Sequence, residues 1–170
     1  MVMKAPGYSS SNKCIKWSES SHCRTEFHEA SPKSWSPTVG TNRLHVTLVG
    51  IRGKNIAIGQ VFQVDSGQNK PYAELYYRDD GSVKMGVATC PGGSKDGCGQ
   101  DLQDLGKVPL GTKFSYDIWF EGGVLKAGVN GNMKTLRTYF KTPRASFKVG
   151  NYNQGTDEAS IHIFELTTSH

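Results

Sequence analysis

Hydrophobic and polar residues alternate along most of this chain, in short runs separated by glycine-rich turns. Residues 114–120, FSYDIWF, show the pattern most clearly, because every second side chain is apolar or aromatic. A period of two is typical of a β-strand that buries one face. The same pattern predicts further strands at 24–28, 44–48, 56–64, 73–78, 82–88, 124–129, 134–140, 146–154 and 161–166.

Short turns join several of these runs. The sequences DDG at 79–81 and NG at 130–131 are hairpin signals, because both place residues that tolerate a positive φ between two strands. A single helical turn is expected at 101–105. Many short strands without repeats or a linker predict one domain over 1–170, an all-β jelly roll. Its two antiparallel sheets would form a sandwich with a concave substrate groove.

Composition narrows the classes of partner. Of the 170 residues, 36% are hydrophobic and 21% are charged, and no apolar run approaches the roughly 18 residues that indicate a membrane-spanning helix. The net charge of +5 suits a polyanion. Because the cations are dispersed rather than gathered with aromatic residues, we expect an anionic polysaccharide and no nucleic acid. We also expect a monomer with no membrane partner.

The four cysteines predict a disulfide-bonded protein. Cys14 and Cys23 bracket eight residues, and Cys90 and Cys98 bracket seven. Three pairings are possible, and zinc binding would need closer C-x₂₋₄-C spacing. We therefore predict local 14–23 and 90–98 disulfides and a secreted, extracellular protein.

The most informative stretch is 146–154, SFKVGNYNQ. As a strand it would bury Phe147 and Val149 on one face. The other face would carry Ser146, Lys148, Gly150, Tyr152 and Gln154. A phenol beside a cation can move a proton, and a bare glycine suits the flat approach of a sugar ring. The alternative is an ordinary half-exposed strand.

A second polar stretch lies at 24–28, RTEFH. Its alternation places Arg24, Glu26 and His28 on one strand face, opposite Phe27. Such a row lines either a solvated edge or one wall of a polar cleft. Of the remaining histidines, His22 and His170 are expected to be solvated, and those on strands to be structural.

Two reaction classes can cleave an acidic polysaccharide. Glycoside hydrolysis needs two carboxylates about 5–9.5 Å apart, and no predicted strand face pairs two carboxylates in that way. β-Elimination of a uronic acid needs donors that neutralise its carboxylate, a base for the C5 proton and an acid for O4. Arg24, Gln60, His28 and Tyr152 supply those groups. This chemistry requires no metal and no cofactor, and we expect neither.

These residues stand in motifs that resemble the alginate lyase superfamily of jelly-roll polysaccharide lyases, typified by polysaccharide lyase family 7 and including glucuronan lyases. The family patterns R-[ST]-E-L-R, Q-I-H and Y-F-K-A-G-x-Y-x-Q match RTEFH at 24–28, QVF at 60–62 and SFKVGNYNQ at 146–154. The resemblance implies that Tyr152 is the general acid and often also the base, and that Arg24 and Gln60 neutralise the substrate carboxylate. Lys148, Gln154 and Glu26 would bind substrate.

Two departures from those motifs bear on the substrate. Phe62 replaces the histidine of Q-I-H, and His28 replaces the last arginine of the first motif. We hypothesise that His28 supplies the missing imidazole from a neighbouring strand; the alternative is a surface histidine without a role.

The loss of that histidine disfavours guluronate, whose H5 and O4 lie on opposite sides of the ring and need a separate base. In glucuronate and mannuronate they lie on the same side, where one tyrosine can serve both. The R-x-E-x-H arrangement resembles the glucuronan lyase branch, so we expect β-1,4-glucuronan as substrate and 4,5-unsaturated uronate ends as product. The alternatives are a polymannuronate-preferring alginate lyase and a non-catalytic carbohydrate-binding jelly roll that stacks sugars on Trp17, Trp35, Tyr72, Tyr76 or Tyr77.

Overall fold

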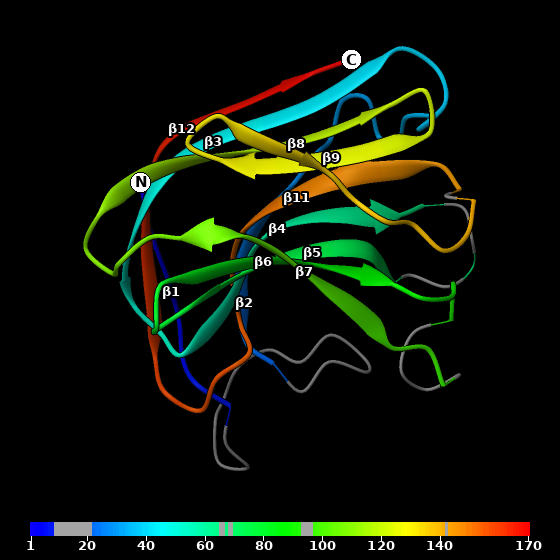
Figure 1. Ribbon diagram of the computed structural model, residues 1–170. Helices are drawn as coiled ribbons and strands as arrows, with labels where there is room; N and C mark the ends of the chain where they lie inside the picture. The colour runs from blue at the N-terminus through cyan, green and yellow to red at the C-terminus, as the bar shows by residue number, and fades with distance from the viewer. Residues whose placement is uncertain (9–21, 65–66, 68–69, 93–96, 142) are drawn as a thin grey trace.

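The computed structural model describes residues 1–8, 22–64, 67, 70–92, 97–141 and 143–170. Two six-stranded antiparallel sheets pack face to face (Figure 1). The first sheet contains, in spatial order, β1 (Val2–Ala5), β12 (Ala159–Ser169), β3 (Thr41–Arg52), β8 (Lys113–Glu121), β9 (Val124–Val129) and β10 (Asn132–Thr135). The second contains β2 (Arg24–His28), β11 (Ala145–Asn153), β4 (Asn55–Gln63), β5 (Pro71–Arg78), β6 (Ser82–Ala88) and β7 (Gln100–Lys107). The described residues form no helix, and the predicted all-β sandwich is confirmed.

The core lies between the two sheets and is built from the apolar half of each alternation. In β8, Phe114, Tyr116, Ile118 and Phe120 are buried while the residues between them are partly exposed. From the opposing sheet, Phe147 of β11 packs on Trp35 with ring centroids 4.7 Å apart. Burial of each such side chain stabilises the fold by roughly 1.5–3 kcal/mol. One face of β11 is therefore fixed in the core, and its other face is presented outward.

Two of the predicted elements are wrong. Residues 101–105 lie within β7 instead of forming a helical turn. The side chain of Gln103 exchanges two hydrogen bonds with the backbone of Arg137, a partner that no local pattern reveals. The strand predicted at 134–140 also has the wrong bounds. Strand β10 spans Asn132–Thr135, and Leu136, which follows it, is buried in the core.

The cysteines agree with the predicted pairing as far as they are described. Cys90 and Cys98 form a disulfide with Cα atoms 5.3 Å apart, which closes the loop between β6 and β7. Cys23 is also disulfide-bonded; Cys14, its predicted partner, lies outside the described residues. Nowhere in the described ranges is there a helix long and apolar enough to cross a membrane.

Candidate active site

Strand β11 brings the two polar stretches of the sequence together, because it pairs with β2 on one side and with β4 on the other. Tyr152 lies opposite Arg24, while Lys148 lies opposite both His28 and Gln60. We call the outward surface of this sheet the polar face. It carries Arg24, Glu26, His28, Gln60, Phe62, Glu74, Tyr76, Lys148 and Tyr152.

The phenol of Tyr152 is held by a stacked cation. The guanidinium carbon of Arg24 lies 3.9 Å from the centroid of the Tyr152 ring. On its other side Arg24 forms an ion pair with Glu26, with an Nη1–Oε2 distance of 3.6 Å. A cation over an aromatic face is attracted by the ring's quadrupole. These two contacts fix the orientation of the Tyr152 ring and of the guanidinium beside it.

Glu26 binds both of the groups predicted to neutralise a substrate carboxylate. Gln60 donates from Nε2 to Oε1 of Glu26 at 2.5 Å, and Oε2 pairs with Arg24. The Glu26 side chain is only 7% exposed, and this burial raises the pKa of its carboxyl. Glu26 is therefore placed to position Arg24 and Gln60, whereas the sequence had suggested direct contact with substrate.

Lys148 lies at the centre of the polar face with its ammonium available. Its Nζ sits 3.2 Å from the centroid of Phe62, and burial lowers its pKa to about 8. Within the described part of the chain, Lys148 makes no hydrogen bond and no ion pair. Since an ammonium has three N–H donors, this residue retains donors for an anionic ligand.

His28 lies next to the position where the family motif has its histidine. Its ring centroid is 6.3 Å from that of Phe62, and its Nε2 lies 2.9 Å from Oγ of Ser146. Burial, and after it the positive charge of Lys148, lowers the pKa of His28. A neutral imidazole therefore stands beside the Phe62 ring at neutral pH.

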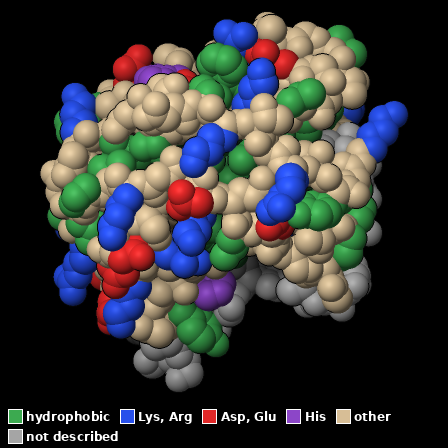
Figure 2. All heavy atoms as spheres, viewed as in Figure 1, with side chains coloured by type: hydrophobic (Ala, Val, Ile, Leu, Met, Phe, Trp, Pro, Cys, Tyr) green, Lys and Arg blue, Asp and Glu red, His purple; other side chains and the backbone are tan. Residues whose placement is uncertain are grey.

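Charges of both signs are interspersed over the face seen in Figure 2, without one large basic patch. This agrees with the dispersed cations of the sequence. In the part of the chain that the structure describes, no cluster of three or more His, Cys, Asp or Glu side chains could hold a metal ion.

A family model for alginate lyase matches residues 1–170 of the chain. The chain belongs to the alginate lyase family. A comparison with curated proteins finds no match.

Solved structures with the same fold are also alginate lyases. Family 7 alginate lyase A1-II′ superposes with a TM-score of 0.83 at 22% identity, covering 100% of this chain and 79% of that one. Alginate lyase PA1167 from Pseudomonas aeruginosa gives 0.77 at 27% identity, covering 90% and 77%. The exolytic lyase AlyA5 from Zobellia galactanivorans gives 0.76 at 16% identity, covering 99% and 83%. The predicted family and jelly roll are confirmed, and the chain is a polysaccharide lyase acting on uronate polymers.

The glycine of the third motif is explained by strand packing in this lyase. A Cβ atom at Gly150 would lie 2.3 Å from the backbone oxygen of Thr25 and 2.7 Å from Cα of Glu26. Both atoms belong to β2, so the bare glycine lets β2 approach β11. The expected flat surface for a sugar ring is therefore not needed to account for this residue.

Replacing Gly150 with alanine should destabilise the lyase by about 1–3 kcal/mol, because the added methyl meets backbone that cannot rotate away. The measurement is urea unfolding followed by tryptophan fluorescence. Gly131→Ala is the matched control for loss of a glycine at positive φ without a contact, since nothing lies near its Cβ position. An equal loss in both variants would contradict the packing explanation.

Two histidines expected to be solvated have partners instead. His22 packs its ring against Tyr152 with centroids 6.0 Å apart, and burial followed by Arg24 lowers its pKa. The signal was present in the sequence, because positions 22, 24, 26 and 28 continue one alternation. His170 pairs with Glu29, with an Nε2–Oε1 distance of 2.7 Å.

The aromatic residues weighed as sugar-stacking platforms are mostly in the core. Trp35, Tyr72 and Tyr77 are 4%, 1% and 0% exposed, and Trp17 lies outside the described residues. Among the members of this set that the structure describes, only Tyr76 belongs to the polar face. Gln154 directly follows β11 and donates from Nε2 to the Tyr152 backbone oxygen at 3.3 Å.

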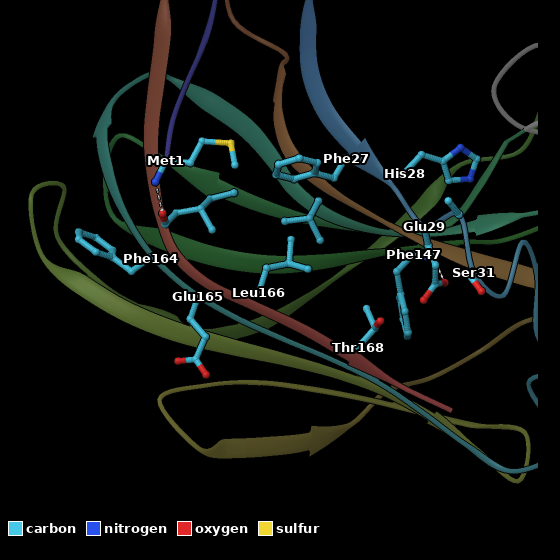
Figure 3. Close-up of a pocket in the computed structure, with 13 residues that line it drawn as sticks. Met1, Phe27, His28, Glu29, Ser31, Phe147, Phe164, Glu165, Leu166 and Thr168 are labelled. Atoms are coloured by element: carbon cyan, nitrogen blue, oxygen red, sulfur yellow. Dashed lines mark hydrogen bonds between the residues drawn. The ribbon is translucent and has the colours of Figure 1, made fainter.

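A cleft of about 500 Å³ lies at the edge of the sandwich between β2 and β12, and His28 is the one residue of the polar face that also lines it. Figure 3 shows Met1, Phe27 and Leu166 around this gap. Its lining is largely apolar and contains none of Arg24, Gln60 and Tyr152. An apolar cleft offers little to a polyanion, so the polar face is the better candidate active site.

Proposed function

We propose that this lyase cleaves β-1,4-glucuronan by β-elimination on the polar face. The proposal rests on what lies beside β11. On the β2 side Arg24 stacks on Tyr152, and on the β4 side position 62 carries a phenyl ring where the family motif has a histidine. Phe62 cannot act as a second base, so the substrate must present H5 and O4 to one tyrosine. Glucuronate has that geometry, and guluronate does not.

The proposed reaction uses one phenolic oxygen twice. Tyr152 enters as the phenolate and takes the proton from C5, the electron pair of that C–H bond forms the C4–C5 double bond, and the C4–O4 bond breaks. The same proton is then returned to O4. Arg24, Gln60 and Lys148 stabilise the negative charge that develops on the C5 carboxylate.

Alginate is the second candidate, because the solved neighbours are described as alginate lyases. Mannuronate shares the same-side arrangement of H5 and O4, so polymannuronate would be its preferred form.

We further propose that the protein is secreted, which the Cys90–Cys98 disulfide supports.

The experiment is incubation with glucuronan, polymannuronate and polyguluronate while the ultraviolet absorbance of the unsaturated uronate is followed. The fastest rise is expected with glucuronan and the slowest with polyguluronate. A faster rise with polymannuronate would select the second candidate. Preference for polyguluronate would overturn the one-tyrosine mechanism.

Replacing His28 with alanine should lower kcat/KM by about 10²-fold, because its imidazole takes the place of the one missing at position 62 as a hydrogen-bond donor to the substrate carboxylate, while Tyr152 remains the base. Because the pKa of His28 is lowered, its ring is neutral through neutral pH and gains a proton only in more acidic solution. We therefore expect the loss in the variant to be present throughout neutral pH. An acidic limb of the wild-type profile that disappears in the variant would make His28 a base and would overturn the one-tyrosine mechanism.

The matched control is His45→Ala, which removes an imidazole from β3 in the other sheet, where it pairs with Asp117. Both variants are assayed on the same polymer across the same pH range. An unchanged rate and profile in His28→Ala would make His28 a surface histidine without a catalytic role.

A further inference from the structure

A second polar cluster lies on the polar face, two strands from Lys148, and the proposed mechanism does not use it. Lys148, Gln60 and Glu74 are successive partners across β11, β4 and β5. Since neighbouring strands are about 4.8 Å apart, Glu74 lies about 10 Å from Lys148 across the sheet. A polymer crossing the strands from the catalytic centre would pass over Glu74 with an adjacent sugar unit.

Glu74 closes a ring of hydrogen bonds with Tyr76 and Gln100. Its Oε2 lies 2.7 Å from the Tyr76 hydroxyl and 2.7 Å from Nε2 of Gln100. The Tyr76 hydroxyl in turn lies 2.9 Å from Oε1 of Gln100. Gly86 makes the ring possible, because a Cβ there would stand 2.6 Å from Gln100 Oε1 and 2.8 Å from Tyr76 Cε2.

The ring has three contacts and needs three hydrogens. The Tyr76 hydroxyl supplies one and the Gln100 amide supplies one. If Glu74 is ionised, one of the contacts brings two oxygens together without a hydrogen between them, and turning the Gln100 amide over does not change this count. A proton on Glu74 satisfies all three contacts.

The surroundings of Glu74 both raise and lower the pKa of its carboxyl group. Its residue is 7% exposed, and burial raises the pKa of its carboxyl. The hydrogen bonds from Tyr76 and Gln100, and after them the charges of Arg24 and Lys148, oppose that rise. The charge of Glu74 also raises the pKa of the Glu26 carboxyl, so the two acidic groups interact. Burial is the largest influence, and the net direction is upward. Tyr76 keeps its own proton, because burial and then Glu74 raise the pKa of this phenol.

Two hydrogen-bonding positions of the ring remain open toward a ligand. Oε1 of Glu74 accepts no hydrogen bond from the described residues. The Gln100 amide carries a second N–H, and its residue is exposed. One acceptor and one donor side by side match a pair of neighbouring sugar hydroxyls. A neutral carboxyl group also avoids repelling the carboxylates of the polymer.

We propose that Glu74, Tyr76 and Gln100 form a neutral subsite, with Glu74 protonated, that binds the hydroxyl edge of a uronate unit adjacent to the unit cleaved. The inference rests on the proposed function, because it places the polymer on the polar face. It adds a specificity element about 10 Å from the catalytic centre. Glu74 is thus a substrate-binding residue and not an acid or base of the reaction.

The first experiment measures kcat and KM on uronate oligosaccharides of increasing length for the wild type, Glu74→Gln and Glu74→Ala. Glutamine can also satisfy all three contacts once the Gln100 amide turns over: its two N–H groups donate to the Tyr76 hydroxyl and to the Gln100 oxygen, Gln100 Nε2 donates to Tyr76, and the oxygen of the new side chain stays open. We expect Glu74→Gln to stay within about threefold of the wild type at neutral pH. Glu74→Ala should raise KM about tenfold on long oligomers, with kcat retained and with no effect on the shortest oligomer cleaved.

The controls separate this subsite from the rest of the mechanism. Glu165→Ala removes a carboxyl group from β12 in the other sheet and should leave every length unchanged. Gly86→Ala keeps all three side chains but displaces Gln100, so it should repeat the length-dependent rise in KM. Unchanged KM in both Glu74→Ala and Gly86→Ala would overturn the subsite, while loss of activity in Tyr152→Phe would leave the proposed function standing.

The second experiment tests the proton directly and does not depend on activity. Carbon-13 NMR of the ¹³C-glutamate-labelled protein identifies the Glu74 carboxyl signal by its loss in Glu74→Gln. We expect the chemical shift of a protonated acid at pH 7. A signal that titrates near the ordinary value of about 4.3 would overturn the protonated ring. If the wild type cleaved no uronate polymer, the proposed function would fail, and this measurement would still decide the protonation state.

Discussion

Replacing Tyr152 with phenylalanine should lower kcat by about 10³- to 10⁴-fold, because the phenolic oxygen is proposed to take the C5 proton and to return it to O4. The substitution removes one oxygen and keeps the ring that stacks under Arg24. Substrate binding should therefore change little, and KM should stay within a few-fold of the wild-type value. The measurement is the initial rate of unsaturated uronate formation on the preferred polymer.

Tyr139→Phe is the matched control. It also removes a phenolic oxygen, but from an exposed tyrosine whose hydroxyl donates to Asp101 at 2.8 Å. Its rate should equal that of the wild type, and thermal unfolding should show that both variants are folded. More than a tenth of the wild-type kcat in Tyr152→Phe would remove Tyr152 from the proton-transfer role.

The elements of the site were predictable because strand alternation is a local property. The period of two in SFKVGNYNQ correctly separated Phe147 and Val149, which are buried in the core, from Lys148 and Tyr152 on the polar face. The sequence motifs then indicated which neighbouring stretches belong beside β11. The catalytic roles of these residues stay predictions.

The parts that were missed depend on contacts between distant segments. The prediction of a helical turn at 101–105 is wrong, because the partners that make this segment a strand lie on β6 and around Arg137. The ring of Glu74, Tyr76 and Gln100 joins two strands that are not neighbours, across the bare surface of Gly86. No spacing within one strand predicts such a meeting, since it depends on the register of three strands.

The position of Glu26 explains how Arg24 and Gln60, the proposed hydrogen-bond donors to the substrate carboxylate, are held in place when no substrate is bound. Arg24 and Gln60 carry N–H groups whose hydrogen bonds are costly to leave unmade in a partly buried site. Glu26 accepts from Gln60 and forms an ion pair with Arg24. A substrate carboxylate would have to share these donors with Glu26. Lys148, which has no such partner among the described residues, would then carry the added negative charge.

This arrangement makes Arg24 the second residue with a large expected effect. Arg24→Ala should lower kcat/KM by about 10²–10³-fold, as does the loss of a single donor to a developing oxyanion. The substitution removes the positive charge that would neutralise the substrate carboxylate. It also removes the guanidinium that orients the Tyr152 ring. Arg24→Lys should recover only part of the loss, because a lysine keeps the charge but has neither the planar fork nor the stacked geometry.

Arg43 offers a close control for this prediction. It also stacks on an aromatic ring, with its guanidinium carbon 4.4 Å from the centroid of Trp119, and pairs with Glu121, but on the other sheet. Arg43→Ala therefore removes the same contacts and the same charge far from Tyr152. If both alanine variants lost activity equally, the effect would come from net charge and not from the site. A loss confined to Arg24→Ala would tie the elimination to the polar face.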